Sequence, residues 1–225
     1  TDASLCVLSS SSRGNSTALA LGSGPSRRVI LIDAGLSPRR THRLLKDVGL
    51  GDVPIHAIIL THLDHDHWND GWLKRMPQGA RLFIHRRHRG RAQRAGLLSV
   101  PTEVFEHEFQ VWPGLCIVPL LVSHDSLGTA AFRLDFTHTR RSIGFATDLG
   151  RATQALIDHF RGVSVLAIES NYCPELQNAS GRPIFLKRRI MGGAGHLSNE
   201  ESAEAIRAIA PTEHVVLLHL SVECN

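Results

Sequence analysis

Lysine and tyrosine are almost missing from this 225-residue sequence, which holds one Tyr and, as its only lysines, Lys46, Lys74 and Lys187. The four cysteines form no CxxC pair, which argues against a cysteine zinc site and against a disulfide framework. No apolar run approaches the ~20 residues of a membrane span, and residues 1–20 lack the basic start and apolar core of a signal peptide. We therefore expect a cytoplasmic protein with reduced thiols and no membrane partner.

Arginine and histidine are abundant instead. Lys and Arg total 25 against 21 acidic residues, which gives a net charge of +4, and there are 14 His. Arginine binds phosphate through a two-pronged fork, so the charge favours a polyanionic partner such as nucleic acid; an arginine-rich composition without any such partner is the alternative. The length and the 42% hydrophobic content predict a single globular domain over residues 1–225.

The apolar pattern predicts two similar halves in which strands are followed by helices. It indicates an α/β protein with two sheets packed face to face and helices outside. Ser198, with Glu201 three residues later, predicts a capping box for the last helix. The expected strands are 5–8, 17–21, 29–32, 55–60, 81–85, 115–122, 129–136, 142–147, 164–169 and 215–220, and the expected helices are 38–48, 86–95, 152–159 and 200–210.

The sharpest motif is THLDHDH at residues 61–67, directly after a buried strand. Imidazole and carboxylate groups at this density can surround one or two divalent ions, and a strand end is where functional groups gather. His124, Asp148 and His219 each follow or end a later apolar strand. A lone histidine is more often structural, but several such positions at successive strand ends indicate one metal centre.

Here the sequence resembles a known family. THLDHDH is similar to the HxHxDH signature of the metallo-β-lactamase superfamily, and His124, Asp148 and His219 match its later metal motifs in order. The segments LSSSSRGNST, SHDSLGTAAFRL, FATDLG, ESNY, LKRRI, GHLSNEESAEAI and LHLS resemble the YycJ (WalJ) branch of nuclease-like hydrolases. The fold that this resemblance implies is the four-layer αββα metallo-β-lactamase sandwich.

The resemblance also implies the cofactor, two divalent ions (Zn, Mn or Fe), and their ligands. One ion would be held by His62, Asp64, His124 and Asp148, and the other by Asp66, His67, Asp148 and His219, with Asp148 and a water or hydroxide bridging both. Asp64 departs from the family, which has a histidine there, and its hard, negative oxygen would favour Mn²⁺ or Fe²⁺ over Zn²⁺. His65 is expected to be exposed or to lie behind the ligands.

Three residues are the candidates for the catalytic chemistry. By resemblance to related nucleases, His196 would be the general acid and Glu169 the residue that orients it, while Asp66 is counted as catalytic as well as a ligand. The alternative makes Glu169 a fold residue and His196 a neighbour of the helix cap.

Several basic and polar segments are candidates for holding a substrate. Lys187, Arg188 and Arg189 are expected to contact the nucleic-acid backbone, together with Asn15 of the Ser-rich loop and Ser198 of GHLSN. The arginines of residues 81–94 predict either a stripe that tracks phosphates or a solvated helix surface. Trp68 and Trp72 could stack on bases, although packing of at least one of them against the sheet is the stronger interpretation.

These features predict a metal-dependent nuclease acting on DNA, with 5′→3′ exonuclease action implied by the resemblance. One alternative is hydrolysis of a small ester, thioester or cyclic phosphodiester, because this fold supports many chemistries. Another is a nucleic-acid-binding protein whose metal site is weakened at Asp64. The sequence leaves the oligomeric state open.

Overall fold

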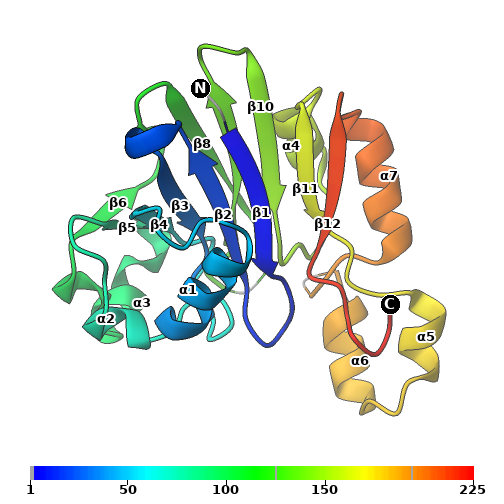
Figure 1. The fold of residues 1–225 in the computed structure, drawn as a ribbon. Helices are drawn as coiled ribbons and strands as arrows, with labels where there is room; N and C mark the ends of the chain where they lie inside the picture. Colours follow the sequence, from blue (N-terminus) through cyan, green and yellow to red (C-terminus); the bar gives the residue numbers. More distant parts are fainter. Residues whose placement is uncertain (1–2, 125, 194) are drawn as a thin grey trace. The chain divides into compact units, whose positions relative to one another are not determined.

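A computed structural model describes residues 3–124, 126–193 and 195–225. Asp125 of the SHDSLG segment and Ala194 of the glycine-rich loop lie outside the described residues. The chain divides into two compact units, residues 1–106 and residues 107–225. Each unit is built on one six-stranded mixed sheet with helices (Figure 1), and the single domain expected over the whole chain stays a prediction.

The sheet of unit 1 has the strand order β1-β2-β3-β4-β5-β6. Its first three strands are antiparallel neighbours, and β3 to β6 run parallel. The strands are β1 (Ala3–Ser9), β2 (Ser16–Leu21), β3 (Arg28–Ile32), β4 (Ile55–Ile59), β5 (Arg81–His85) and β6 (Thr102–Phe105), and the helices are α1 (Pro38–Asp47), α2 (Gly71–Lys74) and α3 (Arg89–Arg94).

The first helix begins and ends where its sequence predicts. The Ser37 side chain accepts a hydrogen bond from the Arg40 amide at the N-terminus, and Pro38 occupies the first helical position, where its missing N–H costs nothing. Gly49 follows the helix with φ of +74°, a conformation that favours glycine. The helix predicted over residues 38–48 is therefore confirmed.

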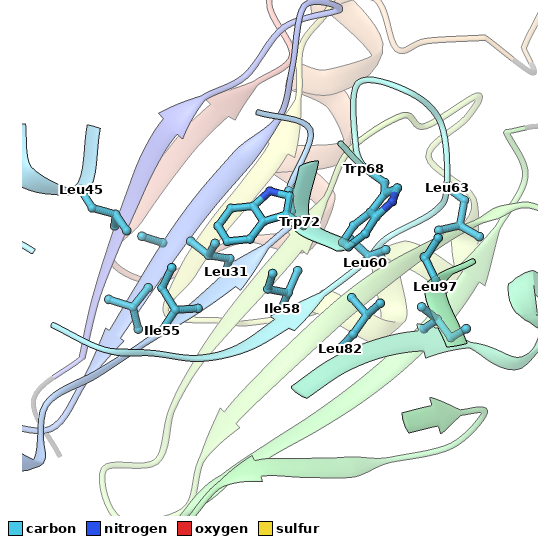
Figure 2. Close-up of a cluster of buried hydrophobic side chains, with 14 of the residues drawn as sticks. Leu31, Leu45, Ile55, Ile58, Leu60, Leu63, Trp68, Trp72, Leu82 and Leu97 are labelled. Atoms are coloured by element: carbon cyan, nitrogen blue, oxygen red, sulfur yellow. The ribbon is translucent and has the colours of Figure 1, made fainter. Parts of the chain in front are cut away.

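Both tryptophans beside the metal motif belong to the core of unit 1. Trp68 and Trp72 are buried, and the Trp72 indole N–H donates to the carbonyl oxygen of Leu36 at 2.9 Å. Figure 2 shows the two rings among Leu31, Ile58 and Leu60. The prediction that these side chains stack on bases is therefore wrong, and the alternative, packing against the sheet, is confirmed.

The sheet of unit 2 has the order β12-β11-β10-β9-β8-β7. Neighbours from β7 to β10 are antiparallel, whereas β10, β11 and β12 run parallel. The strands are β7 (Phe109–Trp112), β8 (Leu115–Val122), β9 (Thr129–Phe136), β10 (Arg141–Ala146), β11 (Val165–Glu169) and β12 (His214–Leu218), and the helices are α4 (Gln154–Phe160), α5 (Pro174–Ala179), α6 (Ile184–Met191) and α7 (Asn199–Ile209).

The core of unit 2 forms where α4 and α7 pack on the sheet. Leu156 and Phe160 of α4 and Ala205 and Ile209 of α7 are buried in one cluster with the apolar side chains of the strands. The predicted capping box is confirmed at the start of α7, where Ser198 and Glu201 bond reciprocally. This box satisfies amide groups that the first turn of a helix would otherwise leave without partners.

Five parts of the fold differ from the sequence expectation. The strands β6 and β7 lie in a stretch for which no element was expected, and α5 and α6 lie in a segment expected to be a loop. The helix expected over residues 86–95 is a 3₁₀ turn at Arg86–His88 followed by α3. Helices α5 and α6 lie next to each other beyond the carboxyl end of β11 (Figure 1).

Strand direction gathers polar residues at one edge of each sheet. In unit 2, β8, β10, β11 and β12 all run the same way, so the residues at or just beyond their carboxyl ends share one edge. In unit 1, the parallel strands β3 and β4 bring Asp33 and residues 61–67 to one edge, where β2 begins after Asn15.

Candidate metal centre and proton shuttle

The metal motif of unit 1 is anchored to the sheet by Asp33. This carboxylate accepts hydrogen bonds from the Thr61 amide at 2.8 Å and from the Thr61 hydroxyl at 3.0 Å. Asp33 is buried and has φ of +61°, a region that few residues other than glycine adopt. Strained backbone of this kind is retained at sites that need a fixed geometry.

Asp33 also orients His67. The Nδ1 atom of His67 lies 2.8 Å from Asp33 Oδ2. The Nδ1–H group therefore donates a hydrogen bond to the carboxylate, which leaves Nε2 as the nitrogen that can bind a metal. The amide nitrogen of Asn15 lies 2.9 Å from that Nε2. A carboxylate behind a histidine is the usual support of a histidine ligand, because it fixes the tautomer and the ring orientation.

The other ligand candidates of the motif converge on the same place. His62 and His67 are buried, and their ring centroids lie 4.0 Å apart. Asp66 Oδ2 lies 3.7 Å from His67 Nε2, and Asp64 Oδ2 lies 3.8 Å from His62 Nε2. His65 points away, with 90% of its side chain exposed.

Asp64 has a cationic partner that the sequence did not indicate. Arg91 of α3 donates from Nη1 to Asp64 Oδ1 at 2.8 Å, and both side chains are partly exposed. The other carboxylate oxygen faces His62. The residue that replaces the family's histidine is therefore one half of an ion pair.

Unit 2 holds a second cluster, at the carboxyl ends of its strands. Asp148, Glu169, His196 and His219 place one potential ligand atom each within 4.8 Å of one another. His219 Nε2 lies 3.7 Å from Asp148 Oδ1. His124 is positioned separately, by a 3.1 Å contact between its Nδ1 and the Gly195 carbonyl oxygen.

The buried Glu169 side chain contacts two histidines of this cluster. Its Oε1 lies 2.7 Å from His196 Nδ1 and 3.2 Å from His219 Nδ1, and its Oε2 accepts from the backbone amides of Leu149 and Leu197. Burial alone would raise the pKa of Glu169. The charge of His196 and the hydrogen bonds from both histidines outweigh burial and hold the pKa of Glu169 below its usual value, so the group is a carboxylate at neutral pH.

Two of the predicted ligands in unit 2 sit on strained backbone. Asp148 and His219 have φ of +53° and +55°, each just past the end of a strand. The side-chain amide of Asn171 donates to the His219 carbonyl oxygen at 2.6 Å, which stabilises that turn. At these positive φ values, the side chains of Asp148 and His219 leave the strand ends in a direction that extended backbone would not give them.

The donor set fits a divalent metal. Imidazole nitrogens and carboxylate oxygens are the ligands that Zn²⁺, Mn²⁺ and Fe²⁺ accept in proteins. In both units a buried carboxylate, Asp33 or Glu169, holds the Nδ1 side of a histidine, which leaves Nε2 for coordination. This support behind the ligand is what a metal centre requires.

Three of the predicted substrate-contact residues have structural roles. Asn15 is buried, and its amide contacts His67 Nε2 and the Asp66 carboxylate. Ser198 is buried as the cap of α7. Lys187 donates to the Asn178 carbonyl oxygen at 2.6 Å. The polar atoms of Asn15 and Ser198 are thus already used inside the fold, and the substrate role expected of all three residues stays a prediction.

Arg188 and Arg189 are exposed on α6, and their role as substrate contacts stays a prediction. In the basic stretch of unit 1, Arg81 and Arg86 pair with Glu103 and Glu106. Two cations of that stretch are thus neutralised at the surface, which favours the interpretation as a solvated face.

Sequence reasoning missed Asp33, Asn171 and Arg91. The rule that located Asp148 also applies to Asp33, since Asp33 directly follows the apolar strand β3. Nothing in the sequence pairs Arg91 with Asp64, because 27 positions separate them.

A family model described as "Beta-lactamase superfamily domain" matches residues 28–220. The chain belongs to this superfamily. Its curated relatives include Exodeoxyribonuclease WalJ of Streptococcus pneumoniae, 28% identical over 97% of this chain and 82% of the relative. Exodeoxyribonuclease YycJ of Bacillus anthracis is 26% identical over 97% of this chain and 83% of the relative. The branch of the superfamily predicted from the sequence is confirmed.

Solved structures confirm the predicted fold class. The metallo-β-lactamase fold protein YhfI from Bacillus subtilis matches with a TM-score of 0.70 at 17% identity, over 99% of this chain and 88% of that one. The chain therefore has the αββα fold of this superfamily. Family membership and the histidine–carboxylate clusters together make this β-lactamase superfamily member a metal-dependent hydrolase. No helix in the described part of the chain is long and apolar enough to cross a membrane.

Proposed function

We propose that this protein is a metal-dependent phosphodiesterase that degrades DNA as a 5′→3′ exonuclease. The similarity to two relatives named exodeoxyribonucleases supports the substrate class. The single observation that carries the chemistry is the pairing of His196 with the buried Glu169, which holds a proton donor next to a proposed ligand histidine. An ester whose leaving group needs no proton has no use for this pair.

Two divalent ions fit the proposal, with the ligand sets that the family resemblance implies. His62, Asp64, His124 and Asp148 would hold one ion, and Asp66, His67, Asp148 and His219 the other. When bound, such ions polarise a phosphoryl oxygen, lower the pKa of a bound water and stabilise the leaving oxygen. Asp66 remains a proposed catalytic residue through the ion that it holds.

The leaving alkoxide needs a proton, and His196 can supply it. Its Nδ1 is engaged by Glu169 at 2.7 Å, so Nε2 is the nitrogen left to carry the transferable proton. The side chain is 21% exposed whereas that of Glu169 is fully buried, so a substrate can reach the ring but not the residue that orients it. Glu169 holds the ring and balances its positive charge before the proton leaves.

The test uses DNA and RNA labelled at either end, with Mn²⁺, Mg²⁺ or Zn²⁺. Exonuclease action from the 5′ end releases the 5′ label first, as a mononucleotide. His196→Ala should reduce turnover by about 10²–10⁴-fold while metal content, measured by mass spectrometry, is retained. His67→Ala should lose metal and activity together.

Two results would contradict the proposal. Loss of metal in His196→Ala would make His196 a ligand and end its role as the acid. Absence of metal-dependent and His67-dependent cleavage of either polymer would end the nuclease assignment and favour a small ester or cyclic phosphodiester.

A further inference from the structure

Helix α6 presents an unusual surface. Ile184 and Phe185 are 68% and 73% exposed, and Arg188 and Arg189 are exposed beside them. Residues three and four apart are neighbours on a helix surface, so Phe185 lies next to both arginines. We call these four residues the α6 face. Large apolar side chains this exposed on a short helix indicate a binding surface rather than a packing element.

The opposite side of α6 already provides the packing. Ile190 is buried with Tyr172 and Cys224, and Leu186 and Met191 pack against the same cluster. The helix is therefore anchored without help from Ile184 or Phe185. Replacement of Phe185 removes surface and leaves this anchor intact.

The α6 face carries two positive charges, those of Arg188 and Arg189. Over the residues that the structure describes, neither Arg188 nor Arg189 forms an ion pair, whereas nearby Arg182 is paired with Glu223 at 2.9 Å. Lys187 is turned away to the Asn178 carbonyl oxygen. An aromatic ring next to two unpaired guanidinium groups complements a ligand that has flat rings and negative charge.

Backbone contacts link the last turn of α6 to the proposed acid. The His196 amide donates to the Ile190 carbonyl oxygen at 3.0 Å. A Cβ at Gly195 would collide with the carbonyl oxygens of Arg189 and Ile190, so the backbone there is closely packed. At 1.5 Å of rise per residue, Phe185 is about 7–8 Å along the helix from Ile190. Phe185 therefore lies on the helix whose last turn accepts the backbone amide of the proposed acid.

We propose that the α6 face is a platform for single-stranded DNA, on which Phe185 stacks one base while Arg188 and Arg189 contact the flanking phosphates. This inference rests on the proposed function and specifies its substrate as an unpaired strand. Stacking needs an exposed base face, which a duplex does not offer, and it is the usual device for holding single strands without reading their sequence.

Binding is measured on the metal-loaded protein with fluorescent phosphorothioate oligonucleotides, single-stranded and as a closed hairpin. Phe185→Leu keeps the apolar bulk but removes the ring, and should weaken single-strand affinity by about 5- to 100-fold. Phe185→Trp should restore binding and show quenching of its own fluorescence by the oligonucleotide, a signal that a structural role would not produce. Binding of the hairpin should change little.

Matched controls separate the α6 face from general surface effects. Leu176→Ala removes a side chain of α5 that is 47% exposed, and Arg207→Gln removes an exposed charge from α7. Both should bind as the unmodified chain does, and circular dichroism should show all variants folded. Arg188→Gln and Arg189→Gln should each weaken binding.

The outcomes distinguish this platform from the nuclease assignment. If the unmodified protein cleaves DNA and Phe185→Leu binds and cleaves single strands equally well, the platform is wrong and the nuclease stands. If the unmodified protein cleaves no nucleic acid, the proposed function itself fails. Two other results would overturn the proposal if oligonucleotide affinity were unchanged in Phe185→Leu. Dissociation of a dimer would assign the α6 face to a second copy of the chain, and loss of binding to anionic vesicles would assign it to a lipid surface.

Discussion

The ion pair between Asp64 and Arg91 changes the electrostatics of the first metal position. A lone aspartate in place of a neutral histidine adds a negative charge and a hard oxygen donor, which favours Mn²⁺ or Fe²⁺. Arg91, 2.8 Å from Asp64 Oδ1, returns the pair to neutrality and occupies one oxygen. The pair therefore resembles the family's histidine in net charge and differs from it in donor atom.

Removal of Arg91 should shift the metal preference. In Arg91→Gln the Asp64 carboxylate regains its full charge, so we expect the ratio of Mn²⁺ to Zn²⁺ affinity to rise several-fold. Competition binding followed by mass spectrometry of bound metal gives this ratio without any activity assay. Arg94→Gln, an exposed position on the same helix, is the matched control. An unchanged ratio in Arg91→Gln would mean that the ion pair with Arg91 does not influence the choice of metal.

At the scale of elements, we expect His159 of α4 to make the stability of unit 2 depend on pH. Its Nε2 donates to the Val118 carbonyl oxygen at 3.1 Å. Burial lowers the pKa of His159, and the charge of Arg133 lowers it further, against the opposing effects of the Val118 hydrogen bond and Asp135. The unfolded chain then binds a proton more readily than the folded chain.

The consequence for stability has a definite sign. The contribution of neutral His159 is complete above the ordinary histidine pKa of about 6.5, and it is lost as the pH falls from there towards the lowered folded-state pKa. His159→Gln can keep a donor to Val118 without titrating. In urea unfolding between pH 7.5 and 5 its free energy of unfolding should fall less than that of the unmodified chain.

His138→Gln, at an exposed turn position, is the control, because it removes an exposed histidine whereas His159 is half-buried. Parallel pH profiles for His159→Gln and the unmodified chain would show that His159 does not contribute to the loss of stability in acid.

How far the sequence predicts each element depends on how strongly the fold constrains it locally. Strands such as β5 and β8 were predicted to the residue, because turn signals bound their apolar runs. Helix α6 was missed because Ile184 and Phe185 face solvent, so its apolar residues do not follow the spacing of a buried face. The strands β6 and β7 are only four residues long, and most of their side chains are at least partly exposed, so their apolar pattern is weak.

The candidate site shows the same division. Ligand types at strand ends were found from sequence, and the structure places each group at the expected sheet edge of its own unit. Asp33 and Arg91 act through other side chains, and only the folded chain reveals such contacts. Ser198 was correctly predicted as a cap from its spacing to Glu201, and in that role its side chain already has hydrogen-bond partners within the fold.

For the whole molecule, the net charge is +4, and almost all of the positive charge comes from arginine. Some of these arginines are neutralised by nearby glutamates, including Arg81 and Arg86, while Arg188 and Arg189 of the α6 face are exposed. The charge that matters for a polyanion is therefore local rather than total. An excess of positive charge speeds the encounter with nucleic acid. On binding, however, counterions are displaced by cationic side chains that are not already paired with a carboxylate.

Salt dependence measures that local charge. For a single strand, the logarithm of affinity falls against the logarithm of salt with a slope of about −0.7 for each phosphate neutralised. The double variant Arg188→Gln, Arg189→Gln should therefore lower the magnitude of the slope by about 1.4. Fluorescence anisotropy at roughly 50–300 mM NaCl measures this slope. Arg207→Gln should leave the slope unchanged. A slope near zero in the unmodified protein would mean that the substrate carries no chain of phosphates, and would direct the search towards a small uncharged ester.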